Sequence, residues 1–492
     1  MAPNAPNDIE TRPLIKSAGK PTVEQGSVAL YLSVTIVLLG AISVGTMLGL
    51  TSPMIPGIQA MGSGNPLYLN TMQASWFGAS VTVGAVAGAY IAGFIMQAIG
   101  RKFTSIICGI PFAVGLLVIG FASQMWMLFV GRVVTGLGVG MISLIVPTYI
   151  GEVSTVKLRG MLGSANQLCI VSGILLIYGL GSVLNWRALA FAAITPPGLL
   201  SLLSIFIPET PTYLLMKNRP EAAKQSLVKL RSCDSDVDAE FTQLEESLSK
   251  QESQASWLEI VKDSSLRTPV LLSLGAMYFQ QISGINCVMF YAKSIFMSAG
   301  FTNHTQITIA LLAIASAQVF FTIVACLIID KTGRKVLLIT GAVIMTLSLT
   351  TFGIYFQLKQ SMAAHVTHSN MTAVHAASSG NPSLSWMALV SMVVFIAAYS
   401  IGIGPIAWLL VGEIIPARAK ERAAGLSTGF NYFLVFILTL EFSNMLVAFT
   451  PQGTFWIFAG NCALSVLFTI FLMPETKGKT LEEIEMYFRK GK

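Results

Sequence analysis

The stretch SLGAMYFQQISGINCVMFYAKSIF, residues 273–296, decides how the rest of the chain is interpreted. It is long and apolar enough to cross a bilayer, yet it carries Gln280, Gln281 and Asn286 within seven residues. An unpaired carboxamide costs roughly 2–7 kcal/mol in hydrocarbon, so we expect these side chains to face a wet cavity. A carboxamide both donates and accepts hydrogen bonds, as a neutral polyol requires. The alternative is that the amides join one helix to another.

One cavity can receive these amides only if the helix is distorted. At about 100° per residue, Asn286 would point about 140° away from Gln281 in a regular helix. Ser283 and Gly284 lie between them, and small residues of this kind permit a kink. The sequence therefore predicts a distortion at Ser283-Gly284.

The composition places the whole chain in a membrane. It has 492 residues, of which 54% are hydrophobic and 11% are charged, whereas soluble proteins are about a quarter charged. Charge-poor blocks long enough to cross a bilayer recur along the chain. We predict twelve spans, near residues 28–50, 73–98, 103–123, 126–150, 161–184, 188–207, 270–296, 306–329, 336–357, 386–411, 424–449 and 453–473.

The basic residues predict the orientation. With both termini in the cytosol, the inner segments hold 26 of the 30 Lys and Arg residues. The net charge of +7 is therefore explained by basic residues that set the orientation in the membrane, and it does not indicate nucleic-acid binding. The first 27 residues are polar, and the first apolar run is too long for a cleavable signal. The six cysteines are expected to be reduced and packed in helices or the cytosolic loop.

An internal repeat divides the chain into two halves. Three short strings, GRK, GE and PET, occur in the same order twice, at residues 100, 151 and 208 and again at residues 333, 412 and 474. Two six-helix halves built on one plan predict a cavity between them and a rocking motion around it. The predicted boundaries are 28–207 and 269–473 for the halves, with a cytosolic tail at 1–27 and another at 474–492.

A charged insert separates the halves. Residues 211–268 hold 18 of the 53 charged residues of the chain, and the predicted insert is 208–268. Pro220 is suited to start a helix, and the spacing of Phe241, Leu244 and Leu248 is typical of an amphipathic one. We expect short helices that lie beneath the bundle and tie the halves together. A solvated spacer is the alternative.

Two other motifs lie outside the spans. In the N-terminal tail, Glu10 stands shortly before Leu14 and Ile15, as in the acidic dileucine signal that a cytosolic clathrin adaptor reads for endosomes and lysosomes. On the outer side, Asn370 and Asn303 each begin a glycosylation sequon. Asn370 lies in a longer loop, predicted at 358–385, so we expect it to be used first.

The chain resembles the sugar porters of the major facilitator superfamily, and within them the class III facilitative hexose transporters. The resemblance covers about residues 45–484. It rests on Gly131-Arg132, Glu152 with Arg159-Gly160, PETP at 208–211, QQISGIN at 280–286, Asp330 to Lys335, Gly404-Pro405-Ile406 with Trp408, and PETKGKTLEEI at 474–484. The class III features include the dileucine-like tail, SWFG at 75–78 and the sequon at Asn370. The implied fold is all-α, with twelve transmembrane helices.

The resemblance implies a sugar site that is lined from several spans. Its residues would be Gln167, Gln280, Gln281, Asn286, Gln318, Trp408 and Asn431. Gln318 stands where many relatives have asparagine. Trp408 would offer a ring face to a pyranose, and a kink is expected beside it at Gly404-Pro405.

Charged residues at the cytosolic edge are interpreted as a gate. Their ion pairs would close the inner side when the cavity opens outward and would separate when it opens inward. The residues are Arg101, Glu152, Arg159, Arg334, Glu413 and Lys420. For the basic ones, the alternative is that they enforce orientation alone.

The first span argues against proton coupling. Proton-driven relatives place an aspartate there, and this chain has Met47 at about that place. We therefore expect a uniporter for a hexose, with glucose as the first candidate, acting as a monomer and without a cofactor or metal. The alternatives are a proton-coupled symporter, a carrier of a disaccharide such as trehalose, and a sugar receptor that does not transport. No enzyme-like constellation is present. The expected location is an endosomal or lysosomal membrane, with the plasma membrane as the alternative.

Overall fold

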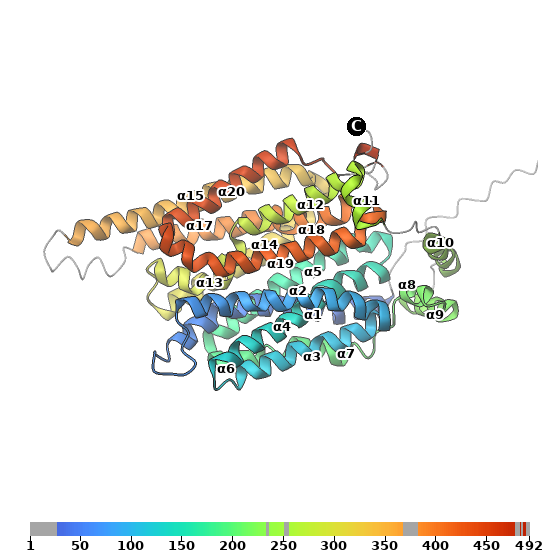
Figure 1. Cartoon of the computed structure of the whole chain (residues 1–492), viewed down its shortest axis with the longest axis horizontal. Coiled ribbons are helices and arrows are strands. Elements are labelled where there is room, and N and C mark those ends of the chain that lie inside the picture. The colour runs from blue at the N-terminus through green and yellow to red at the C-terminus, as the bar shows by residue number, and fades with distance from the viewer. Residues whose placement is uncertain are drawn as a thin grey trace, which may run out of the picture.

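The computed structural model describes residues 27–232, 236–249, 255–367, 382–477, 483 and 486–488. Within these ranges the chain forms long, nearly parallel helices (Figure 1). Eleven stretches are long and apolar enough to cross a membrane. The one remaining predicted span, the seventh along the chain, is divided between two helices, Ser264–Ile282 and Ile285–Ser298. The predicted all-α fold with twelve spans is confirmed.

The first half contains six spans, and the last of them is made of two short helices. Ile194 lies between those two helices, and Pro196 and Pro197 stand in the first turn of the second, where a missing N–H group costs no helical hydrogen bond. The helices are α1 (Val28–Gln59), α2 (Thr71–Ile99), α3 (Arg101–Gly120), α4 (Met125–Val153), α5 (Val156–Val183), α6 (Trp186–Ala192) and α7 (Thr195–Leu203).

The second half repeats the plan, with two of its spans broken. The helices are α12 (Ser264–Ile282), α13 (Ile285–Ser298), α14 (His304–Thr332), α15 (Arg334–Thr367), α17 (Pro382–Ile401), α18 (Ile403–Ile414), η1 (Ala417–Ala419), α19 (Lys420–Ala448) and α20 (Thr450–Phe471).

The seventh span breaks where the sequence predicts it. α12 ends at Ile282 and α13 begins at Ile285, and Gly284 between them has the left-handed φ of 84°. A Cβ at Gly284 would lie 2.5 Å from the Phe458 ring, so both the backbone and the packing require glycine here.

The tenth span breaks two residues earlier than predicted. The helix is interrupted at Gly402, between α17 and α18, and not at Gly404-Pro405. Pro405 lacks the N–H that would bond the carbonyl four residues earlier, at Ile401. The helix is therefore weakened by the missing hydrogen bond in the turn before the proline. A second difference is that α15 continues to Thr367, well into the loop predicted at 358–385.

The cytosolic insert forms short helices, as expected, with anchors on both halves. α8 (Pro211–Met216), α9 (Pro220–Leu230) and α10 (Val237–Ser249) lie together at one end of the bundle (Figure 1). There the Arg231 guanidinium donates to the Val153 carbonyl of α4 at 2.8 Å. α11 (Trp257–Lys262) instead joins the second half, where Glu259 pairs with Arg418 at 2.7 Å.

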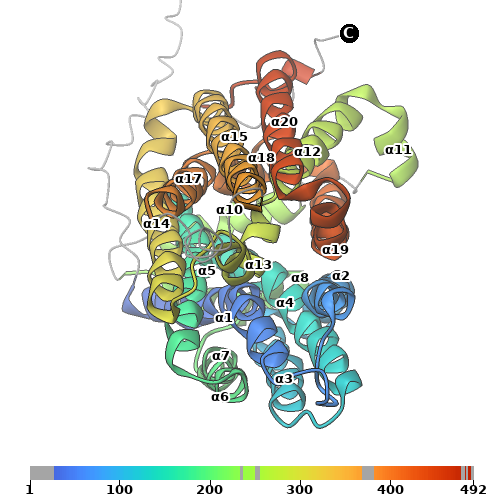
Figure 2. The same cartoon turned by 90° about the vertical axis from the view of Figure 1, so that its left-hand side faces the viewer.

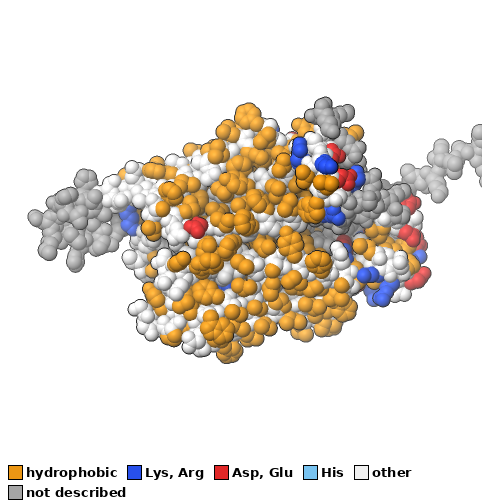
Figure 3. Space-filling model, in the orientation of Figure 1, with side chains coloured by type: hydrophobic (Ala, Val, Ile, Leu, Met, Phe, Trp, Pro, Cys, Tyr) orange, Lys and Arg blue, Asp and Glu red, His pale blue; other side chains and the backbone are white. Residues whose placement is uncertain are grey.

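The halves meet through a few helices, and the end-on view separates them clearly (Figure 2). α2 packs against α19, α5 against α14 and α1 against α13. Apolar side chains cover the middle of the outer face, and most charged side chains visible on it gather at the end that carries α9 and α11 (Figure 3). This distribution suits a bundle that crosses a bilayer with its charges in water.

Candidate functional site

Four of the predicted sugar-site amides form one hydrogen-bonded cluster. Gln281 Nε2 donates to Asn431 Oδ1 at 3.0 Å, and Asn431 Nδ2 donates to Gln280 Oε1 at 2.9 Å. Asn286 Nδ2 in turn donates to Gln281 Oε1. The sequence thus brings together residues from α12, α13 and α19, and we name Gln280, Gln281, Asn286 and Asn431 the amide cluster.

The two helix breaks position the amide cluster. The break at Gly284 turns α13 so that Asn286 reaches back to Gln281 on α12. Gln280 Nε2 donates to the Gly404 carbonyl at 2.8 Å, in the first turn of α18 beyond the break at Gly402. Each amide therefore has a polar partner inside the bundle, which removes the cost of an unpaired carboxamide.

The amide cluster is mostly buried in this conformation. Gln280, Gln281 and Asn431 are buried, whereas Asn286 is half-buried. Amides that are bonded to one another can exchange those bonds for sugar hydroxyl groups, because each carries donors and acceptors of the same kind. The arrangement can therefore bind a polyol without leaving a polar group unpaired.

Among the described residues, three other predicted site residues form no hydrogen bond with the amide cluster. Gln318 on α14 is buried, and its Oε1 has no hydrogen-bond partner among the described residues. Gln167 is half-buried on α5, the helix of the first half that packs against α14. Trp408 on α18 is 39% exposed and lies one turn after Gly404. A buried orphan oxygen and an exposed indole are both free to bind a ligand.

At the predicted cytosolic edge of the first half, the three repeated strings meet. Arg101 Nη2 lies 2.7 Å from Glu152 Oε1, and Thr210 Oγ1 donates to the other oxygen of Glu152 at 2.6 Å. Glu209 accepts from the backbone N–H groups of Arg101 at 2.9 Å and Lys102 at 3.2 Å. Its carboxylate thus caps the start of α3.

The second half repeats the pairing of these three strings. Arg334 Nη2 lies 2.9 Å from Glu413 Oε1, and Thr476 Oγ1 donates to Glu413 Oε2 at 2.6 Å. Glu475 accepts from the backbone N–H groups of Arg334 and Lys335, at 3.1 Å in each case. The roles of Thr210, Thr476, Glu209 and Glu475 were missed at the sequence level, although the repeat of PET in both halves was a usable signal.

Each of these ion pairs joins helices of the same half. Lys420 Nζ donates to the Gly412 carbonyl of the same half at 3.0 Å. Arg159 lies on α5, but its side chain is not among those that the structure describes. The role of these residues as a gate stays a prediction.

Polar contacts between the halves lie toward the outer ends and the middle of the helices. Ser75 donates to Ser443 at 2.7 Å, the Tyr178 hydroxyl donates to the Met289 carbonyl at 2.6 Å, and the backbone N–H of Lys293 donates to Ser52 at 3.0 Å. Closer to the end that carries the insert, the Ser143 and Tyr432 hydroxyl groups are 2.6 Å apart.

Arg132 is fully buried in the first half. It donates to the Phe77 carbonyl at 3.1 Å and to the Thr51 hydroxyl at 2.6 Å, and its guanidinium lies over the Phe77 ring. Its Nη1 is 3.8 Å from the sulfur of Met47. Met47 therefore faces this cation directly, at about the place where the family resemblance implies an aspartate in proton-driven relatives.

The other predicted motifs have little structural coverage. Glu10, Leu14, Ile15 and Asn370 lie outside the described residues. Asn303 is exposed at the start of α14, and its Oδ1 accepts from the Thr305 N–H at 3.1 Å.

Comparison with known proteins finds similar chains over nearly the whole length. Residues 28–488 match the family described as "Sugar (and other) transporter". The chain is 40% identical to facilitated glucose transporter member 8 of solute carrier family 2 from Mus musculus, over 99% of both chains. It is 35% identical to member 6 from the same species, over 93% of this chain and 91% of that one. These relatives confirm the resemblance to the class III facilitative hexose transporters, and within that class to glucose transporter type 8, with type 6 as neighbour.

Two further similarities bear on substrate and fold. The facilitated trehalose transporter Tret1 of Bombyx mori is 37% identical, over 92% of this chain and 86% of that protein. Among solved structures, the major facilitator superfamily proton:xylose symporter XylE, bound to 6-bromo-6-deoxy-D-glucose, aligns with a TM-score of 0.74 at 24% identity. That alignment covers 93% of this chain and 99% of XylE, and it shows the fold.

Proposed function

The chain belongs to the sugar transporter family of the major facilitator superfamily, and we propose that it is a facilitative carrier that moves a hexose by alternating access. Glucose is the first candidate substrate. The observation that supports this most is the amide cluster at the break between α12 and α13. We infer that Gln167, Gln318 and Trp408 complete the sugar site from α5, α14 and α18. A millimolar dissociation constant, about 4 kcal/mol, would let such a site both recognise and release its sugar.

Uniport is favoured over symport by the surroundings of Arg132. Its guanidinium is satisfied by Thr51, by a backbone carbonyl and by the Phe77 ring, and it faces the thioether of Met47. α1 contains no Asp or Glu, so it offers no carboxylate that could exchange a proton with this site. A neutral sugar would then move down its own gradient.

The pairs at the cytosolic edge support a rocking motion of two rigid halves. Arg101–Glu152 and Arg334–Glu413 each fasten helices within a half. In this proposal the pairs are closed while the cavity opens outward and separate when it opens inward, and the two halves then move apart at this end. The insert would limit that separation, since α8 to α10 hold one half and α11 holds the other.

Uptake into proteoliposomes tests the proposal. The purified protein should equilibrate radiolabelled glucose across the vesicle membrane and should not concentrate it when a pH gradient is imposed. Accumulation above the external concentration would replace uniport by proton-coupled symport. Saturable binding without any uptake would replace transport by a receptor function.

A disaccharide is the second candidate substrate. The similarity to a facilitated trehalose transporter favours it. Competition of glucose uptake by glucose, fructose, galactose and trehalose separates the two candidates. Inhibition by hexoses alone supports the hexose assignment, and preferential inhibition by trehalose supports the other.

The location and the partners follow from the motifs outside the spans. We place both termini in the cytosol, with Glu10, Leu14 and Ile15 read by a clathrin adaptor, and the protein in endosomal or lysosomal membranes. Changing Leu14 and Ile15 to Ala should move the protein to the plasma membrane. Unchanged distribution would remove the sorting role.

The glycan and the oligomeric state are also proposals. We place the glycan on Asn370 first, with Asn303 second because its side chain already caps α14. Glycosidase digestion of Asn370→Gln and Asn303→Gln variants would identify the site used. We propose that each monomer, surrounded by membrane lipid, carries its own sugar pathway.

A further inference from the structure

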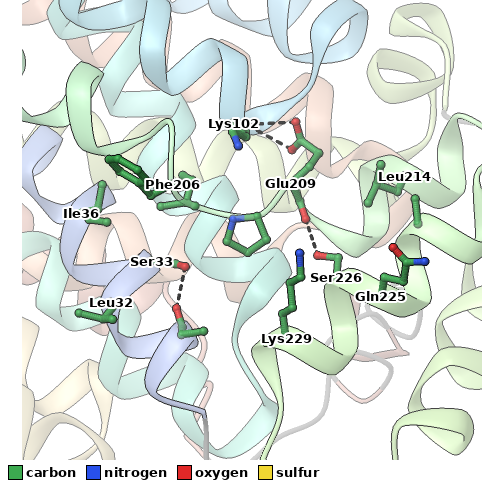
Figure 4. A pocket seen from close by; sticks show the side chains of 14 residues that line it. Leu32, Ser33, Ile36, Lys102, Phe206, Glu209, Leu214, Gln225, Ser226 and Lys229 are labelled. Carbon is green, nitrogen blue, oxygen red and sulfur yellow. Dashed lines mark hydrogen bonds between the residues drawn. The ribbon is translucent and has the colours of Figure 1, made fainter.

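A cavity lies at the cytosolic edge of the first half, away from the amide cluster. It has a volume of about 600 Å³ and is lined by α1, the start of α3, the segment from α7 to α8, and α9 (Figure 4). None of its lining residues belongs to the proposed sugar site. We name it the edge cavity.

Two lysines supply the charge of the edge cavity. Lys102 lies at the start of α3 and Lys229 near the end of α9. Within the described part of the chain, neither ammonium group forms an ion pair or a hydrogen bond. In Figure 4, Lys229 extends toward the segment that carries Glu209. The cavity thus holds two cations without an anionic partner of their own.

The one carboxylate in the cavity is already bonded. Glu209 accepts from the backbone N–H groups of Arg101, Lys102 and Thr210, so its charge is directed to the start of α3. The formal charge of the lining, two lysines and one glutamate, is therefore +1. An anion is the ligand that would complete it.

The opposite wall of the edge cavity is apolar and faces outward. Figure 4 places Leu32, Ile36 and Phe206 together on that side. Leu32, near the start of α1, is 59% exposed, and Phe206, just after the end of α7, is 77% exposed. In a bilayer, exposed apolar side chains beside lysines suit the boundary between acyl chains and headgroups.

The second half shows what this position looks like when it is closed. Lys335 is the counterpart of Lys102 in the repeated GRK string, and its Nζ donates to the Ile470 carbonyl of α20 at 2.8 Å. The same lysine is thus satisfied by protein in one half and left open to a cavity in the other.

We propose that the edge cavity binds the phosphate-bearing headgroup of an anionic phospholipid from the cytosolic leaflet. Lys102 and Lys229 bind the phosphate, and Leu32, Ile36 and Phe206 contact the acyl chains. Because the cavity joins α1 and α3 to α9, a bound lipid fastens the insert to the first half. A soluble phosphate ester shares the headgroup chemistry but makes no use of the apolar wall. This inference does not depend on which sugar is carried.

The test uses the full-length protein in nanodiscs of phosphatidylcholine with increasing phosphatidylserine. The thermal midpoint should rise with the phosphatidylserine content. In the double variant Lys102→Gln/Lys229→Gln, the phosphatidylserine content that gives half of the midpoint rise should be roughly 25-fold higher. Each lysine strengthens binding to an anionic surface about fivefold. Native mass spectrometry should show one fewer retained anionic lipid.

The control is Lys335→Gln/Lys224→Gln, which removes the same charge from the counterpart GRK string and from α9, outside the cavity. It should keep the response of the natural chain. Equal loss in both double variants, or no rise in the natural chain, would overturn the site. A midpoint rise of the same size with inositol trisphosphate in neutral nanodiscs would overturn the lipid assignment. The single variant Lys229→Glu, at an exposed side chain, repeats the test should the double variant fail to fold.

Discussion

Arg132 Nη1 lies 3.8 Å from the sulfur of Met47, inside the first half and fully removed from solvent. This contact places an uncharged side chain beside the buried cation. It gives the proposed uniport a physical basis, because a thioether cannot carry a proton between the two sides of a membrane.

Met47→Asp should make transport depend on pH. A carboxylate beside Arg132 would form a buried pair whose protonation changes the charge of the site. Glucose equilibrium exchange, measured from pH 5 to pH 8, should then vary with pH in this variant. Met47→Asn is the matched control, because it has the same shape and does not titrate. Identical pH profiles for the two variants would contradict the assigned role of this position.

Gly284→Ala should destabilise the protein by more than about 1 kcal/mol, because a φ of 84° is strained for alanine and its Cβ would meet the Phe458 ring. Gly425→Ala is the control, since Gly425 lies inside α19 with open space around it. There alanine should be neutral or slightly stabilising. Thermal midpoints in detergent would measure both. Equal midpoints would show that the break at Gly284 does not require glycine.

Glu152→Gln should cost about 1–3 kcal/mol, because it removes the partner of a largely buried guanidinium and weakens the bond to Thr210. Glu413→Gln should have a similar effect, since it occupies the same place in the second half. Glu259→Gln breaks a more exposed pair with Arg418 and should cost less than about 1 kcal/mol. A cost for Glu152→Gln no greater than that for Glu259→Gln would contradict a fastening role for the edge pairs.

Glu209 and Glu475 should respond to pH with opposite signs, although they cap equivalent helices. Burial raises the pKa of Glu209 and outweighs the N–H donors of Thr210, Lys102 and Arg101. Burial also acts to raise the pKa of Glu475. There the hydrogen bonds from four backbone N–H groups have the larger combined effect and lower the pKa; the donors are Lys477, Lys335, Arg334 and Thr476.

The sign of each effect on stability follows from linkage. A lowered pKa means that Glu475 stabilises the fold above the usual glutamate pKa, about 4.3, and loses that contribution as the pH falls below it. A raised pKa means that the contribution of Glu209 is full at low pH and is lost as the pH rises through the raised value. Between pH 7 and about pH 3, the midpoint advantage of the natural chain should therefore shrink relative to Glu475→Gln and grow relative to Glu209→Gln. Parallel changes would contradict these pKa shifts.

Much of the fold could be predicted from the sequence because a bilayer leaves few choices. Long charge-free runs must be helices, and the Lys and Arg counts suffice to predict an orientation. The break at Ser283-Gly284 was predictable because two amides on opposite faces needed a common cavity. The interruption at Gly402 was missed by two residues, since the effect of Pro405 is felt upstream of the proline itself.

The site was predictable in its residue types and less so in its contacts. The amides were found because a carboxamide in a span needs an explanation, but their bonds to one another depend on how α12, α13 and α19 pack. The partners of Glu152 and Glu413 depend on three strings that lie 51 to 79 residues apart and meet only in the folded chain. The edge cavity has no sequence signal, because Lys102 and Lys229 look like ordinary orientation charges.

The central claim is that sugar passes through a site built on the amide cluster, and the uptake of radiolabelled glucose by Gln281→Leu in proteoliposomes tests it most directly. Leucine removes the donor to Asn431 and the acceptor of Asn286, so uptake should fall at least about tenfold while the protein remains folded. Asn461→Leu, which removes an amide from α20 outside the cluster, should transport like the natural chain. Unchanged uptake by folded Gln281→Leu would contradict the account.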